Sequence, residues 1–175
     1  MVDNYRNDLI LIASADKNWG IGFNNKLLKR VPEDMNRFSG LTRGNLIIVG
    51  RKTLESFKDA KPLPDRLNVV MTHDKDYRCE GAIIVHDLDE LMESICRFPG
   101  KVYVSGGEAI YRLLLPYCKK AMITKINSDF ISDAELPNLD ADTSWVVDNE
   151  GDWQESKSGV QFKYVLYIRS KRISF

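Results

Sequence analysis

The alternation of elements in this chain is clearest in residues 46–56, which read LIIVGRKTLES. Leu46 to Val49 is an apolar run without polar alternation, which is typical of a strand covered on both faces, as in a parallel sheet. Directly after Gly50, the segment from Arg51 to Phe57 contains no breaker and predicts a short helix. A buried strand that passes at once into a helix is the repeating unit of an α/β fold.

The same unit recurs on both sides of this stretch. Further apolar runs predict strands over residues 9–14, 67–72, 82–85, 102–105 and 121–126. Start and stop signals predict helices over residues 32–38, opened by Pro32, over 87–98, capped by Asp87, and over 108–115, stopped by Pro116.

Two segments depart from this alternation. Residues 19–31 contain two glycines and two adjacent asparagines and predict a long loop of the functional or mobile kind. Residues 153–157 and 160–168 show alternating patterns and predict a closing antiparallel pair. We therefore expect one α/β domain over residues 1–175, with a mainly parallel central sheet of about eight strands, an antiparallel C-terminal strand and about four helices.

Composition excludes several classes of protein. Lys plus Arg and Asp plus Glu both number 25, and this balance argues against an extended nucleic-acid surface or a polybasic membrane anchor. The first apolar run, residues 9–13, is too short for a signal peptide or a membrane span, so we expect a cytoplasmic protein. Three cysteines without close spacing and only two histidines predict idle or buried thiols and no metal site.

Three features lie where open α/β sheets bind their ligands, outside the carboxyl ends of strands or near them. Gly50 to Thr53 brings a strand into a helix N-terminus, whose free N–H groups favour a phosphate. Ser105 to Ala109 contains paired glycines, which allow close approach of a ligand but lack the third glycine of the dinucleotide fingerprint. Asp34 opens a helix with Phe38 one turn later. Each feature alone also fits a structural role: a helix start, a tight turn, or an acid placed for the helix dipole.

In their order and spacing, these features and their neighbours resemble the dihydrofolate reductase family from Leu9 to Ile126, and the tail fits the closing strands of that family. The matching pieces are Ile21-Gly22 with Asn25, Val31 to Met35, Ile48 to Ser56, Pro62 to Arg66, Ser105 to Gly107 continuing through Tyr111 to Pro116, and Thr124.

The resemblance implies an NADPH-dependent oxidoreductase of one-carbon metabolism that reduces 7,8-dihydrofolate to 5,6,7,8-tetrahydrofolate and is an antifolate target. The hydride would pass from nicotinamide C4 to pterin C6, and a water would protonate N5. Asp34, held by Thr124, would be catalytic: it would orient the pterin through N3–H and the 2-amino group and favour the protonated ring electrostatically. The other substrate-binding residues implied are Ile12, Leu27, Met35, Phe38 and Phe57 for the apolar walls, and Arg66 for the folate carboxylate.

The resemblance also implies a set of NADPH-binding residues. The pyrophosphate would lie between the helix starts at Lys52-Thr53 and Gly107-Glu108, across a cis Gly106–Gly107 bond, and Arg51 would meet the 2′-phosphate. The whole set is Ser14, Ile21, Gly22, Asn25, Arg51, Lys52, Thr53, Thr72, His73, Ser105, Gly106, Gly107, Glu108, Ala109, Ile110 and Tyr111. The expected partner is the small-molecule substrate, without nucleic acid or membrane, and the expected state is a monomer.

This sequence departs from the family pattern at three positions. Lys29 stands where many members have a tryptophan that orders a water near the pterin, and we expect Lys29 to face solvent. Asp65 replaces a glycine in a turn that tolerates it, and Ser105 replaces an aliphatic residue and adds a hydroxyl.

Two rival hypotheses stay open at this point. The related reductase of riboflavin synthesis resembles this fold and uses NADPH, but it lacks the acid on the helix after the mobile loop, so Asp34 and Arg66 argue against it. A non-catalytic nucleotide-binding module is disfavoured because Asp34, Thr124 and both phosphate turns are intact.

Overall fold

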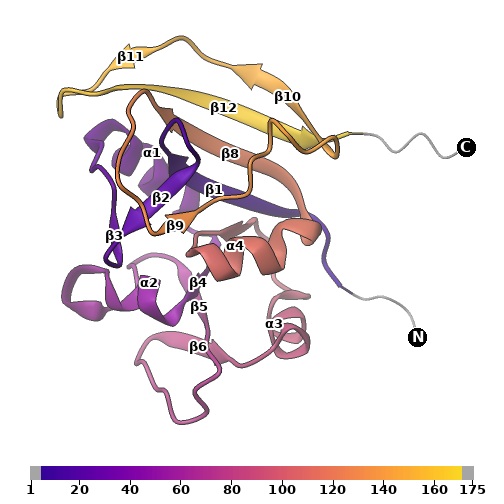
Figure 1. The fold of residues 1–175 in the computed structure, drawn as a ribbon. Helices are drawn as coiled ribbons and strands as arrows, with labels where there is room; N and C mark the ends of the chain where they lie inside the picture. Colours follow the sequence, from indigo (N-terminus) through magenta and orange to yellow (C-terminus); the bar gives the residue numbers. More distant parts are fainter. Residues whose placement is uncertain (1–4, 171–175) are drawn as a thin grey trace, which may run out of the picture.

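The structure, a computed structural model, describes residues 5–170; residues 1–4 and 171–175, the two ends of the expected domain, lie outside the described part. Its main sheet has the strand order β10-β12-β8-β1-β7-β4-β5-β6 (Figure 1). Every neighbouring pair from β8 to β6 is parallel, whereas β12 is antiparallel to both β8 and β10. The prediction of a mainly parallel sheet with an antiparallel C-terminal strand is therefore confirmed. The strands are β1 (Leu9–Ala15), β4 (Leu46–Gly50), β5 (Leu67–Met71), β6 (Ala82–Val85), β7 (Val102–Val104), β8 (Cys118–Ile126), β10 (Trp145–Glu150) and β12 (Gln161–Arg169), with β11 (Gln154–Glu155) paired to β12.

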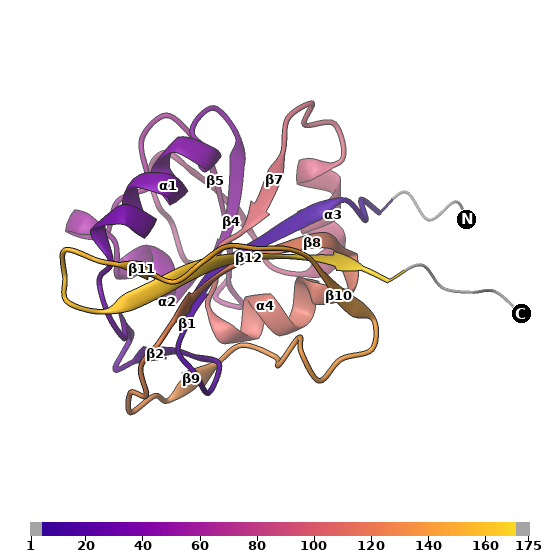
Figure 2. The ribbon, with the colours of Figure 1, turned by 90° about the horizontal axis from the view of Figure 1, so that it is seen from above.

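Helices cover both faces of this sheet. The helices are α1 (Pro32–Thr42), α2 (Arg51–Glu55), α3 (Leu88–Ile95) and α4 (Glu108–Leu114), with short 3₁₀ turns η1 (Lys58–Ala60) and η2 (Leu115–Tyr117). Leu9 and Leu11 of β1 pack with residues of α3 and α4, and Ile10 packs with Leu54 of α2, as the alternation of side chains along a strand requires. Figure 2 shows α1 and α4 on opposite sides of β8 and β12. Asp87 caps α3 as predicted, accepting a hydrogen bond from the Glu90 N–H at 2.8 Å.

The prediction that residues 19–31 form only a loop is wrong. They contain β2 (Gly20–Phe23) and β3 (Lys26–Leu27), which pair with each other, and β2 also pairs with β9 (Ala134–Glu135). Two of the four residues of β2 are glycines, which have low strand propensity, and its partner β9 lies far along the chain. β2 therefore pairs with the nearby β3 and with the distant β9, and the local sequence pattern predicts neither pairing.

The predicted closing pair is correct only in part. β11 is antiparallel to β12 but has just two residues, and the longer partner of β12 on that side is β10, which was not predicted. Its apolar residues are confined to Trp145, Val146 and Val147, of which only Trp145 is buried, so β10 lacks the alternation of a half-buried strand. Helix α1 begins at Pro32, as predicted, and continues to Thr42.

Two further observations concern the classes of protein excluded from composition. The three cysteines are unpaired, with Cys118 buried, Cys79 half-buried and Cys96 exposed. Within residues 5–170, no helix combines the length and the apolar character that crossing a bilayer requires.

Candidate active site

The two glycine-containing turns lie side by side because β4 and β7 are neighbours in the sheet. The Gly50 N–H donates to the Gly106 carbonyl at 2.8 Å, and the Ser105 N–H donates to the Ile48 carbonyl at 2.9 Å. The Gly106–Gly107 bond is cis, as the resemblance implied. The two turns that were expected to hold phosphates thus form one continuous surface.

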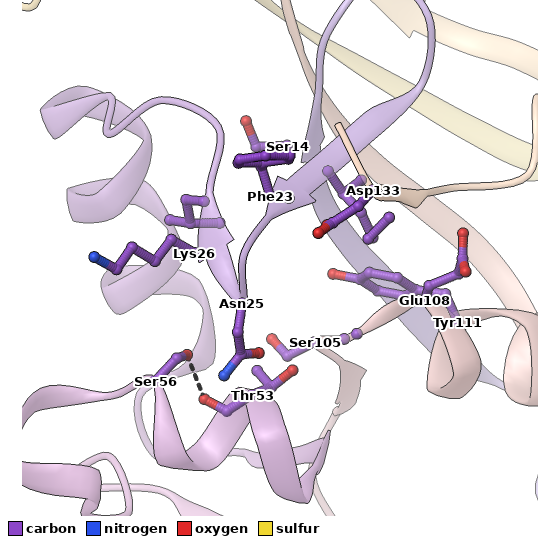
Figure 3. Close-up of a pocket in the computed structure, with 16 residues that line it drawn as sticks. Ser14, Phe23, Asn25, Lys26, Thr53, Ser56, Ser105, Glu108, Tyr111 and Asp133 are labelled. Atoms are coloured by element: carbon purple, nitrogen blue, oxygen red, sulfur yellow. Dashed lines mark hydrogen bonds between the residues drawn. The ribbon is translucent and has the colours of Figure 1, made fainter. Parts of the chain in front are cut away.

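A cleft of about 150 Å³, partly open to solvent, lies over this surface. Figure 3 shows the Asn25 side chain directed from the β2–β3 hairpin toward Thr53 of α2 and Ser105 of the glycine turn. Among the predicted site residues, those that line the cleft are Ser14, Ile21, Gly22, Asn25, Leu27, Thr53, Ser105, Gly106, Gly107, Glu108 and Tyr111. Eleven of the predicted site residues therefore lie around one cleft.

Five lining residues were missed: Phe23, Lys26, Ser56, Asp133 and Ala134. Asp133 and Ala134 reach the cleft only through the pairing of β9 with β2, for which the sequence gives no local signal. Conversely, the predicted cofactor residues Arg51, Lys52, Thr72, His73, Ala109 and Ile110 are not among the lining residues.

Arg51 is engaged elsewhere. Its guanidinium forms ion pairs with Glu55 at 2.8 Å and with Asp74 at 2.7 Å, and it lies over the ring of Tyr77. These two carboxylates balance a cation at a helix N-terminus, where a positive charge alone is unfavourable. In this state Arg51 has anionic partners from the protein itself.

Asp34 and Thr124 meet beside the cleft, although neither is among its lining residues. Asp34 lies in the first turn of α1, and the Thr124 hydroxyl on β8 donates to its Oδ1 at 2.5 Å. Burial raises the pKa of Asp34 above its usual value, and the Thr124 hydrogen bond and the charge of Arg37 oppose this rise. The carboxyl therefore retains a proton to higher pH than an exposed aspartate does.

Two observations connect this carboxyl to the cleft. Thr124 is the partner of Ser14 in the parallel β1–β8 ladder, and Ser14 lines the cleft. Tyr111, another lining residue, is buried and donates its hydroxyl to the Ile12 carbonyl at 2.8 Å. Burial and the nearby charge of Asp34 both raise the pKa of Tyr111. The acid therefore lies next to the inner wall of the cleft.

The predicted apolar walls differ in their exposure. Ile12, Met35, Phe38 and Phe57 are half-buried, and none of the four lines the cleft described above. Leu27 lines the cleft but is 58% exposed, so it lies at the rim and not in an enclosed wall.

Arg66 is held in place by neutral groups. Its guanidinium donates to the Thr42 hydroxyl at 2.7 Å, the Ser39 hydroxyl at 2.9 Å and the Pro64 carbonyl at 2.8 Å. None of the ion pairs found within residues 5–170 includes Arg66. The end of α1 and the turn before β5 thus hold a fixed cation suited to an anion from outside the protein.

Hydrogen bonds hold the β2–β3 hairpin both to the segment before β9 and to α2. The Asp133 N–H donates to the Gly22 carbonyl and the Asn24 N–H donates to the Asp133 carboxylate, each at 3.0 Å. The Asn25 amide donates to the Lys52 carbonyl at 3.1 Å. Lys29, at the end of this segment, is half-buried, and no hydrogen bond or ion pair in the described part joins it to Asp34.

Gly106→Ala is expected to lower the free energy of unfolding by about 1–3 kcal/mol, because Gly106 has φ +109° and an added Cβ would lie 3.3 Å from the Tyr111 ring. The matched control is Gly40→Ala, a helical position where an added Cβ meets nothing within 4 Å. This control should raise stability by about 0.5–1 kcal/mol. Urea unfolding of both variants measures the difference, and equal stability of Gly106→Ala and the parent would contradict the strained position of Gly106.

Comparisons with known proteins agree with this geometry. The family model described as dihydrofolate reductase matches residues 8–169. The chain is 33% identical to the dihydrofolate reductase of Bacillus subtilis over 156 residues, which cover 89% of this chain and 91% of that protein. It is 36% identical to that of Mycobacterium leprae over 145 residues, covering 81% of this chain and 86% of the other. The structure of dihydrofolate reductase from Enterococcus faecalis complexed with NADP(H) and RAB-propyl superposes with a TM-score of 0.86 at 26% identity, covering 95% of this chain and 99% of that one. From Asp8 to Arg169, the chain belongs to the dihydrofolate reductase family.

Proposed function

We propose that this protein reduces 7,8-dihydrofolate to 5,6,7,8-tetrahydrofolate with NADPH. The observation that carries the proposal is the partly buried Asp34 carboxyl, which accepts the Thr124 hydrogen bond beside a cleft lined by Ser14 and the Gly106–Gly107 turn. The family match and this acid together favour dihydrofolate reduction over the related reductase of riboflavin synthesis.

Asp34 would bind the pterin edge through N3–H and the 2-amino group, since a carboxylate accepts two parallel hydrogen bonds. Its negative charge then favours a protonated ring, and a water would deliver the proton to N5. Because the Asp34 charge and the protonation of the ring depend on each other, the pair titrates as a unit. Activity should fall as pH rises through the apparent pKa of the pair, and burial of Asp34 moves that limit upward.

The residues present fit NADPH. The two turns approach each other closely, since a Cβ added at Gly107 would be in van der Waals contact with the Thr53 hydroxyl, at 3.4 Å. Hydroxyl donors from Ser14, Thr53 and Ser105 line the same cleft, and such donors suit phosphate and carboxamide oxygens. NADPH, when bound, supplies the hydride that is added to pterin C6. Arg51 would contact the 2′-phosphate only after exchanging Glu55 or Asp74 for it.

The experiment is a spectrophotometric assay of the purified full chain with NADPH and dihydrofolate. We expect NADPH oxidation that requires dihydrofolate, is slower with NADH, and is inhibited competitively by methotrexate. Turnover of the ribosylated pyrimidine of riboflavin synthesis without turnover of dihydrofolate would reject the proposal. Gel filtration of the same sample tests our prediction of a monomer.

Thr124→Val is expected to lower kcat/KM for dihydrofolate about 10-fold, because it removes the hydrogen bond to Asp34 and a bond to a charged group contributes about 1.5–3 kcal/mol. That bond lowers the pKa of Asp34, so its loss should move the alkaline limit of activity to higher pH. Thr124→Ser keeps the hydroxyl and is the control. A Val variant with the rate and pH profile of the Ser variant would show that the hydroxyl has no role.

A further inference from the structure

Helix α1 contacts the sheet at two neighbouring points. At the first, Asp34 accepts the hydroxyl hydrogen bond from Thr124. At the second, the Arg37 guanidinium carbon lies 3.8 Å from the centroid of the Tyr164 ring. Asp34 and Arg37 are three residues apart and lie on one side of the helix.

The two contacts are also adjacent on the sheet. Thr124 of β8 and Tyr164 of β12 are directly opposite each other in the antiparallel β8–β12 pair, so their side chains project from the same face. The four side chains therefore form two neighbouring bridges between one helix and two strands. This arrangement connects the C-terminal strand to the candidate catalytic acid.

Arg37 has no anionic partner that would neutralise it. It takes part in none of the ion pairs or side-chain hydrogen bonds found within residues 5–170, and it is half-buried. The neighbouring acid, Glu33, accepts hydrogen bonds from the Ser156 hydroxyl and the Lys157 N–H, both at 2.8 Å. Arg37 is thus a fixed cation one turn from Asp34.

The ionisable groups around this pair come from four elements. The Arg37 charge lowers the pKa of Asp34 on α1, and it opposes the burial that raises the pKa of Tyr103 on β7 and of Tyr164 on β12. The charge of Asp34 raises the pKa of Tyr111 on α4, and the charge of Glu33 raises the pKa of Tyr164. Neutral tyrosines add no charge near neutral pH, which leaves Arg37 as the cation that acts on Asp34.

We propose that Arg37, stacked on Tyr164, is a positioning residue that holds a positive charge beside Asp34 and so sets the pH range over which the enzyme works. Its kinetic consequence rests on the proposed function, whereas its effect on the Asp34 carboxyl does not. The alternative is that Arg37 only covers the Tyr164 ring, a contact that stabilises the fold without affecting the acid.

The first experiment measures kcat/KM for dihydrofolate against pH in Arg37→Gln. Removing the cation destabilises the Asp34 carboxylate, so the alkaline midpoint of activity should rise by about 0.5–1 pH unit. This shift is at the low end of the range for a neighbouring charge, because Arg37 is partly exposed and solvent screens it. Arg37→Lys keeps the charge but not the planar stacking and should shift the midpoint by less. Tyr164→Leu should shift it in the same direction as Arg37→Gln, because the guanidinium loses the ring that fixes it.

Two controls separate this role from a structural one. Tyr164→Phe keeps the ring and should have the parent midpoint. Arg97→Gln removes an equal charge from an exposed position after α3 and should also leave the midpoint unchanged. A parent-like profile in Arg37→Gln, or an equal shift in Arg97→Gln, would overturn the proposal.

The second experiment does not depend on turnover. The Asp34 carboxyl carbon can be followed by NMR titration of the free full-length protein, with the signal assigned from its absence in Asp34→Asn. A higher titration midpoint in Arg37→Gln supports the proposal even if dihydrofolate is not the substrate, and an unchanged midpoint rejects it. Absence of dihydrofolate turnover in the parent would reject the proposed function alone.

Discussion

Asp34→Asn is expected to lower kcat/KM for dihydrofolate by about 10²- to 10⁴-fold near neutral pH, the range for loss of a group that assists proton transfer. Asparagine has nearly the same shape and can still accept the Thr124 hydroxyl, so the fold and the cleft should be unchanged. It carries no negative charge, however, and it presents an amide N–H where the pterin N3–H requires an acceptor. Rates over a range of pH measure the loss.

The same variant should bind NADPH with parent affinity, because the cleft that fits NADPH is lined by other residues. Calorimetric titration with NADPH is therefore the control. The pH profile is also informative: the parent should lose activity as pH rises through the apparent pKa of the Asp34–pterin pair, which burial of Asp34 raises, and the variant should lack this transition. Parent-like rates in Asp34→Asn would remove Asp34 from the mechanism.

Arg66→Gln is expected to lower kcat/KM for dihydrofolate by about 10²-fold, mainly through a higher KM. The structure holds this guanidinium between Thr42, Ser39 and Pro64, with no ion-pair partner among residues 5–170. An arginine that is already fixed loses little freedom when it binds a carboxylate, and hydrogen bonds to charged groups contribute about 1.5–3 kcal/mol each. Binding energy lost equally from substrate and transition state changes KM and leaves kcat near its parent value.

A truncated substrate separates this effect from a change in the fold. A dihydropterin without the glutamate portion has no carboxylate for Arg66 to bind. The parent and Arg66→Gln should therefore reduce it at similar rates, and the difference between them should exist only for dihydrofolate. A similar loss on both substrates would mean that Arg66 supports the end of α1 and does not bind the substrate.

The sequence predicted those parts of the fold in which each residue's role is local. The apolar run at 46–49 and the glycine after it correctly predicted a buried strand passing into α2, and the paired glycines expected near a ligand line the cleft. The Asp34–Thr124 contact joins residues 90 positions apart, and the family resemblance alone brought them together.

The remainder depends on contacts that no local pattern shows. β2 pairs with the distant β9 as well as with β3, and Asp133 lines the cleft beside that β2–β9 pairing. β10 is an edge strand in which only Trp145 is buried, and Arg51 takes its carboxylate partner Asp74 from beyond β5. In each case the partner residue is distant in sequence, and its identity follows only from the folded topology.

The most direct test is a crystal structure of the full chain with NADP⁺ and folate. The account predicts that the Asp34 carboxylate accepts hydrogen bonds from the pterin 2-amino group and N3–H while Thr124 remains bound to it, with the nicotinamide in the cleft between Ser14 and the Gly106–Gly107 turn. A pterin bound away from Asp34, or a dinucleotide outside that cleft, would contradict it.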